Sequence, residues 1–188
     1  MKKIIIIVII SIALFGACSL MDGKLSGVIT YYFNENYGDK ADVGAEIYII
    51  KTSDFDKDSA KAISNFLMYK GSCNIRKAEI SLKEAKEEID IYEEIRLIHN
   101  IDSIIDTESD EVYSKILLIR DNKNTIKILA DGNGSFNTNL TFGEYYVLIV
   151  SNHRKGNNLV DYNGLIDFNT IKIKPRKETT LNAKFGIE

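Results

Sequence analysis

The hydrophobic pattern changes its period twice along this chain of 188 residues. Near 25–33 and 43–51, β-branched and aromatic residues predict two strands. From 53 to about 120, apolar residues recur at steps of three and four, which is typical of helices. Strand-type patterns then return in five segments, 125–130, 135–140, 144–151, 170–174 and 179–185. The sequence therefore predicts a mainly β fold, a seven-stranded β-sandwich with an α-helical insertion between its second and third strands.

The inserted block predicts an antiparallel helical hairpin. Ser53 and Asp54 are the expected caps of a first helix, and Gly71-Ser72 is the expected break after it. A second helix is expected at about 76–100, with a narrow apolar seam that requires a partner helix, as in a coiled coil. The segment 111–120 is compatible with a helix or a strand, and we favour a helix.

The first 18 residues have the three parts of a secretory signal. Lys2 and Lys3 give a positive start, Ile4 to Phe15 is apolar apart from one serine, and small residues precede Cys18. The apolar run is shorter than the roughly 20 residues that a transmembrane helix needs.

The segment Leu14-Phe15-Gly16-Ala17-Cys18 resembles the lipobox of bacterial lipoproteins, although that family commonly has leucine where this chain has Phe15. The resemblance implies cleavage between Ala17 and Cys18 and lipidation of the Cys18 thiol. Two or more acyl chains give stable membrane attachment, whereas one gives marginal binding. An ordinary signal cleaved nearby and an uncleaved anchor are the alternatives.

This interpretation divides the chain into a cleaved signal (1–17), a lipidated tether (18–24) and a β domain (25–188). It predicts a protein anchored by lipid in the cell membrane or outer membrane, facing the periplasm or the cell exterior. Because the net charge is −3 and cleavage removes two lysines, the lipid and not a basic patch must hold the protein to the bilayer. The same charge argues against nucleic acid as a partner.

Four stretches resemble the carboxypeptidase regulatory-like domain, a transthyretin-like (prealbumin-like) β-sandwich. They lie in the order expected for that family, with Phe142 where the family often has proline: Gly27-Val28-Ile29-Thr30, Asp42 to Ile49, Ala130 to Phe136 and Phe142 to Leu148. The resemblance covers 25–51 and 125–186. It implies a non-enzymatic binding or structural module.

We find no pattern of residues typical of catalysis, metal binding or a cofactor site. His99 and His153 have no second ligand at metal-binding spacing, and we expect both on the surface. Asp131, Asn133 and Ser135 begin like a calcium loop but lack its glutamate, so a hairpin turn is favoured. Cys73 is expected to be a buried thiol at the hairpin turn, or to pair between molecules.

The sequence therefore predicts a cell-envelope lipoprotein that is not an enzyme. The sandwich would act as a scaffold, and the helical hairpin would contact a protein partner. The alternative is an accessory subunit of an envelope complex for transport or polysaccharide handling.

Overall fold

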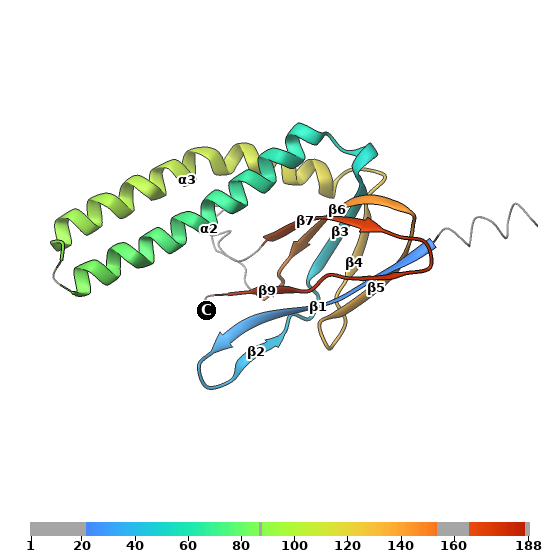
Figure 1. The fold of residues 1–188 in the computed structure, drawn as a ribbon, viewed down its shortest axis with the longest axis horizontal. Helices are drawn as coiled ribbons and strands as arrows, with labels where there is room; N and C mark the ends of the chain where they lie inside the picture. The colour runs from blue at the N-terminus through green and yellow to red at the C-terminus, as the bar shows by residue number, and fades with distance from the viewer. Residues whose placement is uncertain (1–21, 87, 154–165, 187–188) are drawn as a thin grey trace, which may run out of the picture.

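A computed structural model describes residues 22–86, 88–153 and 166–186, which form two packed sheets and a projecting helical hairpin (Figure 1). The first sheet is built around the long strand β1, with the strands β1 Asp22–Asn34, β2 Gly38–Ala41, β5 Ser135–Thr141, β8 Glu178–Thr180 and β9 Ala183–Phe185. The second sheet is antiparallel in the order β4-β3-β6-β7, with the strands β3 Glu46–Lys51, β4 Ile126–Leu129, β6 Gly143–Val150 and β7 Ile166–Ile173.

Strand β1 changes its antiparallel partner at Ile29. Residues 22–28 pair with β5 and residues 30–34 with β2, while β8 and β9 pair with β1 in parallel. The change is made by two backbone bonds of Ile29, whose N–H donates to Gly134 O (2.8 Å) and whose carbonyl accepts from Asp42 N (2.9 Å). Figure 1 shows that β1 begins at the end of the sandwich that lies away from the tip of the hairpin.

The predicted sandwich core lies between the two sheets. Along β6, alternate residues Tyr145, Val147 and Ile149 enter this core, as the period of two requires. The other members come from both sheets and the flanking segments: Leu25, Ile29, Ala45, Ile47, Ile49, Ala130, Phe136, Leu140, Ile173, Ala183 and Phe185.

The predicted helical hairpin is present, but its turn is in a different place. Helix α2 runs from Lys57 to Ala85 and α3 from Ile91 to Arg120, so Gly71 lies inside α2 and the expected second helix at 76–100 is wrong. A glycine costs a helix only about 1 kcal/mol relative to alanine, and buried apolar residues on both sides, Phe66 and Cys73, hold α2 together.

The helix starts also differ from the expected caps. Ser53 and Asp54 form a short 3₁₀ turn, η1 (Thr52–Asp54), and Asp56 caps α2 by accepting a hydrogen bond from Ser59 N (2.7 Å). Asp90 caps α3 in the same way through Glu93 N (2.8 Å). His99 is exposed, as expected, and lies in the first half of α3, not at the end of a helix near residue 100.

The base of the hairpin covers the outer face of the second sheet. Tyr48, Ile50 and Leu148 pack there against residues of both helices, among them Ile63 and Ile119. Strands β3 and β6 are therefore buried on both faces, which explains their nearly continuous apolar sequence.

The strands differ from the prediction in three details. The segment between the predicted strands 25–33 and 43–51 contains the short strand β2, which the sequence pattern does not predict. The expected strand 179–185 is divided into β8 and β9, so the described residues hold nine strands and not seven. Strand β1 begins at Asp22, three residues earlier than expected.

Candidate binding surfaces of the helical hairpin

The predicted lipidation and cleavage residues, Cys18 and Ala17, lie outside the residues that the structure describes. Within the described residues, no helix is both long enough and apolar enough to cross a bilayer. The candidate surfaces below therefore come from the sandwich and the hairpin alone.

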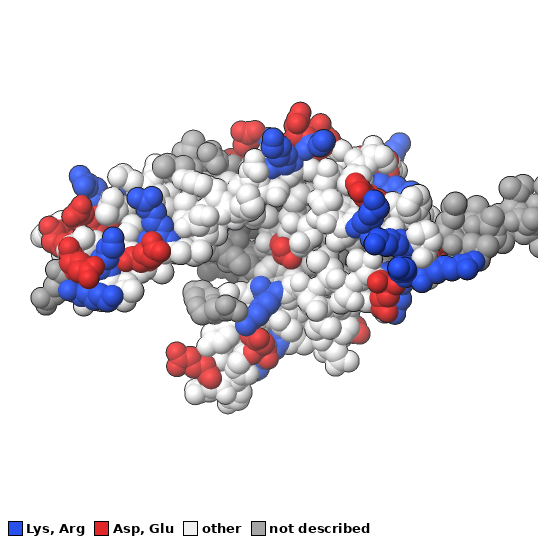
Figure 2. Space-filling view, in the orientation of Figure 1, with Lys and Arg blue, Asp and Glu red and all other residues white. Residues whose placement is uncertain are grey.

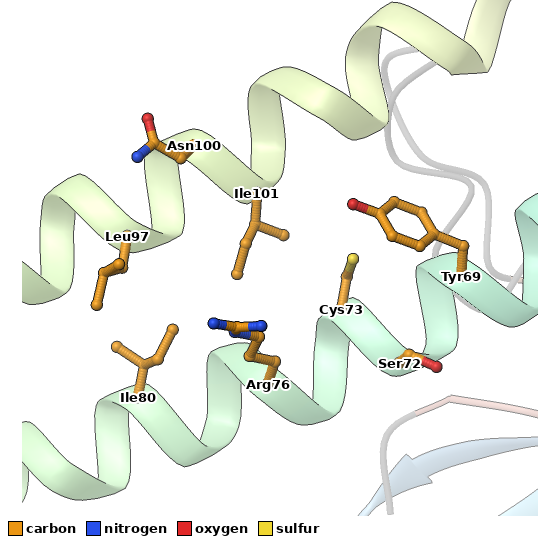
Figure 3. Close-up of a pocket in the computed structure, with 8 residues that line it drawn as sticks. All are labelled: Tyr69, Ser72, Cys73, Arg76, Ile80, Leu97, Asn100 and Ile101. Carbon is orange, nitrogen blue, oxygen red and sulfur yellow. The ribbon is translucent and has the colours of Figure 1, made fainter.

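A groove of about 320 Å³ lies between α2 and α3 (Figure 3). Its walls are mostly apolar, with Ile80, Leu97 and Ile101 facing one another across the helices. The thiol of Cys73 is 6% exposed and unpaired, and it lies on this inner side of α2. Burial therefore agrees with the sequence prediction, but Cys73 is in the middle of a helix and not at the hairpin turn.

Arg76 is the charged side chain of this groove, and Figure 3 shows it extending between the two helices. Among the described residues, no ion pair or hydrogen bond engages its guanidinium. The Asn100 and Ser72 side chains add polar atoms at the rim. A groove of this kind can accept a small molecule with an apolar body and an anionic end.

The inner side of α2, which faces α3, carries two lysines. Lys70 is 4% exposed, with its ammonium 5.8 Å from the centre of the Phe66 ring. Lys77 forms an ion pair with Asp102 of α3. The contact between the helices is therefore a mixed apolar and charged one over this stretch.

The opposite side of α2 is apolar and exposed. Met68, Ile75 and Leu82 are 67%, 65% and 55% exposed. Each is followed three residues later by a small residue that is also exposed: Gly71, Ala78 and Ala85. We call these six residues the outer seam. In Figure 2, acidic and basic side chains gather together toward the tip of the hairpin, so the hairpin surface is neither strongly positive nor strongly negative.

A buried polar cluster on Asp42 was not predicted from the sequence. This carboxylate is 0% exposed and accepts hydrogen bonds from Asn152 N (3.1 Å), His153 N (3.2 Å) and the Ser151 hydroxyl. The His153 ring also contacts it through Nδ1 (2.8 Å) and stacks on Tyr31 with 4.6 Å between ring centres. His153 is 36% exposed in its side chain, so the predicted surface position is only partly solvated.

The Asp42 cluster serves the fold. It joins the start of β3 to the end of β6, and its carboxylate satisfies backbone N–H groups that would otherwise lack partners. No local pattern indicates this cluster, because its two polar segments lie far apart in the sequence and meet only in the folded chain.

Glu46 is the centre of an ion cluster at the base of the hairpin. Its carboxylate lies near Lys127 of β4 and Arg120 of α3 (3.7 Å) and accepts a hydrogen bond from the Tyr48 hydroxyl (2.5 Å). Partial burial opposes ionisation, but the bonds from Lys127 and Tyr48 and the two positive charges outweigh it and lower the pKa of Glu46. The cluster fastens the end of α3 to the second sheet.

The stretch from Asp131 to Ser135 forms the predicted hairpin turn. The Asp131 carboxylate accepts from Asn133 N (2.8 Å) and Ser135 N (2.9 Å), and Gly134 has φ +72°. Within the described part of the chain, no three His, Cys, Asp or Glu side chains group in a way that could hold a metal ion.

No protein-family profile matches this sequence, and no curated protein matches it either. Solved structures show a distant likeness. A protein of Pseudomonas aeruginosa, provisionally described as carbohydrate-binding, superposes with a TM-score of 0.41 and 9% identity over 88% of this chain and 90% of that chain.

Two pilins are also similar. The minor pilin GBS52 of Streptococcus agalactiae gives a TM-score of 0.37 and 7% identity over 90% of this chain and 47% of the pilin. The pilus backbone protein of Streptococcus pneumoniae gives 0.24 and 14% over 70% of this chain and 30% of the pilin. The chain thus spans half or less of these pilins. At these scores the likeness assigns neither a family nor a function.

Proposed function

We propose that the protein is a lipid-anchored module of the cell envelope, with the sandwich as scaffold and the helical hairpin as the arm that binds another protein. The observation that carries this proposal is the outer seam, a charge-free apolar strip on a helix that projects from the sandwich. Exposed apolar patches on soluble domains mark interaction sites. The lipobox-like segment ending at Cys18 supports the anchor, and the four stretches that begin at Gly27, Asp42, Ala130 and Phe142 support a carboxypeptidase regulatory-like ancestry of the sandwich.

The anchor is tested by mass spectrometry of the mature amino terminus. We expect a diacylglyceryl group on an amino-terminal Cys18 and recovery of the protein in the membrane fraction. The Cys18→Ala variant should lack the lipid and leave that fraction. An unmodified Cys18 in the wild-type protein would refute the anchor.

The arm is tested by shortening it. Replacing residues 76–101 with a short glycine-rich loop removes the outer half of the hairpin and keeps Ile63, Ile105 and Ile119 on the second sheet. This variant should remain folded and anchored but lose its partner in cross-linking on whole cells. Retention of every cross-linked partner would contradict the role of the arm.

A further inference from the structure

Both sides of α2 carry apolar residues. The side turned to α3 combines a buried apolar core with Lys70 and Lys77, whereas the six residues of the outer seam are all apolar or small and are exposed. Phe66, Cys73 and Ile80 face the hairpin core, and the residues two places later lie about 200° further round the helix. The outer seam is therefore almost opposite to α3, and α3 cannot cover it.

The outer seam has the spacing of a coiled coil. Its large residues Met68, Ile75 and Leu82 are seven residues apart, and a small residue follows each of them by three. This is a heptad repeat with large residues at one core position and small ones at the other. A Cβ built on Gly71 would meet nothing within 4 Å, so no packing against the described residues accounts for a glycine within this helix.

We propose that the outer seam docks against the outer seam of a second copy of this chain, with the two α2 helices antiparallel. In that orientation every layer joins one large and one small side chain, as well-packed cores do. Met68 of one copy meets Ala85 of the other, Ile75 meets Ala78, and Leu82 meets Gly71. A parallel pair would instead set large against large and small against small.

The residues that flank the seam also suit self-association. Ser72, Asn74 and Ser81 lie beside it without charge, and the other two flanking residues, Glu79 and Lys86, carry opposite charges. Two copies therefore do not bring like charges together along most of the contact. The stretch of α2 from Met68 to Ala85 spans 18 residues, so the seam is about 27 Å long and about 10 Å wide, roughly 300 Å² per copy. Stable dimers bury about 800 Å² per partner, so the contact is a weak, reversible one.

The inference deepens the proposed role of the arm by naming its partner. Sedimentation equilibrium of the full chain in mild detergent should show a mass that rises reversibly from monomer to dimer. Ile75→Glu should raise the dissociation constant at least about tenfold. Leu118→Glu is the matched control, since Leu118 is a similarly exposed aliphatic residue (58%) on α3, and it should change the constant less than about twofold.

Disulfide trapping tests the orientation. In a Cys18→Ala background, a mixture of the Met68→Cys and Ala85→Cys variants should form a mixed disulfide dimer, and neither variant alone should do so. Dimers of Met68→Cys alone would overturn the antiparallel arrangement. A wild-type chain that stays monomeric up to about 0.5 mM would overturn self-association itself. Neither result bears on the lipid at Cys18, whose failure is detected separately by mass spectrometry.

Discussion

Removing the carboxylate of Asp42 should destabilise the protein more than any other loss of a single polar side chain described above. Asp42 is 0% exposed and accepts from the Ser151 hydroxyl, two backbone N–H groups and the His153 ring. In Asp42→Ala these donors lose their acceptor in the interior, and each buried donor left without a partner costs about 1–3 kcal/mol. Allowing for partial relaxation, we expect a loss of about 3–5 kcal/mol in the free energy of unfolding.

Asp42→Asn separates hydrogen bonding from charge. The amide oxygen can keep the three bonds made to Oδ1, and the Ser151 hydroxyl can turn to accept from the amide nitrogen. Only the additional strength of a charged acceptor is lost, so the expected cost is about 1–2 kcal/mol.

Urea unfolding followed by circular dichroism measures both values, with an unchanged dependence on urea as the sign that the same surface unfolds. Asp39→Ala is the control, because Asp39 is 40% exposed and pairs with Lys184 at the surface (3.2 Å). It should cost less than about 1 kcal/mol. An Asp42→Ala variant as stable as Asp39→Ala would refute the view that these donors depend on this carboxylate.

Four further changes test other parts of the structure, and urea unfolding measures each. Ile50→Ala, at a fully buried position between sheet and hairpin, should cost about 2–5 kcal/mol, and a cost under about 1 kcal/mol would mean that the hairpin is loosely packed. Glu46→Gln should lower the free energy of unfolding at neutral pH by about 1 kcal/mol or less. Because the folded pKa of Glu46 lies below 4.5, this difference from wild type should vanish as the pH falls through that pKa. A difference in stability that persists at lower pH would contradict the ion cluster. Gly134→Ala should destabilise by more than about 1 kcal/mol, since φ is +72° and the new Cβ would lie 2.3 Å from Ile29 O. Gly71→Ala should instead stabilise the protein by about 0.5–1 kcal/mol, because the added Cβ meets open space within a helix. If Gly134→Ala and Gly71→Ala changed the free energy of unfolding in the same direction, the roles assigned to these two glycines would be wrong.

The sequence predicted the strands and the inserted hairpin because their periods are local properties. The residues of β6 alternate between two cores, and the turn at Gly134 requires a residue that tolerates positive φ. The alternation of a strand puts Tyr48 on the face of β3 opposite to Ile47 and Ile49, yet Tyr48 is 2% exposed, because the hairpin covers that second face. That burial depends on tertiary packing, which a strand pattern cannot reveal.

The place of the hairpin turn was mispredicted for a similar reason. Glycine often ends a helix, but at Gly71 the packing of residues on both sides outweighs the cost of about 1 kcal/mol that glycine has in a helix relative to alanine. The true turn lies before Asp90, whose capping bond to Glu93 N starts α3. The Asp42 cluster could not be predicted, since Asp42 and His153 are 111 residues apart and meet only in the folded sandwich.

The starting point of β1 limits how an anchored chain can meet its neighbours. Three residues separate Cys18 from Asp22, a distance of at most about 14 Å when extended, so a lipid on Cys18 would hold that end of the sandwich against the bilayer. The hairpin tip lies at the other end of the molecule (Figure 1) and would point away from the surface. An antiparallel pair of α2 helices would then carry its two lipid groups at opposite ends, which suits a bridge across the gap between two facing membranes better than a pair of neighbours in one membrane.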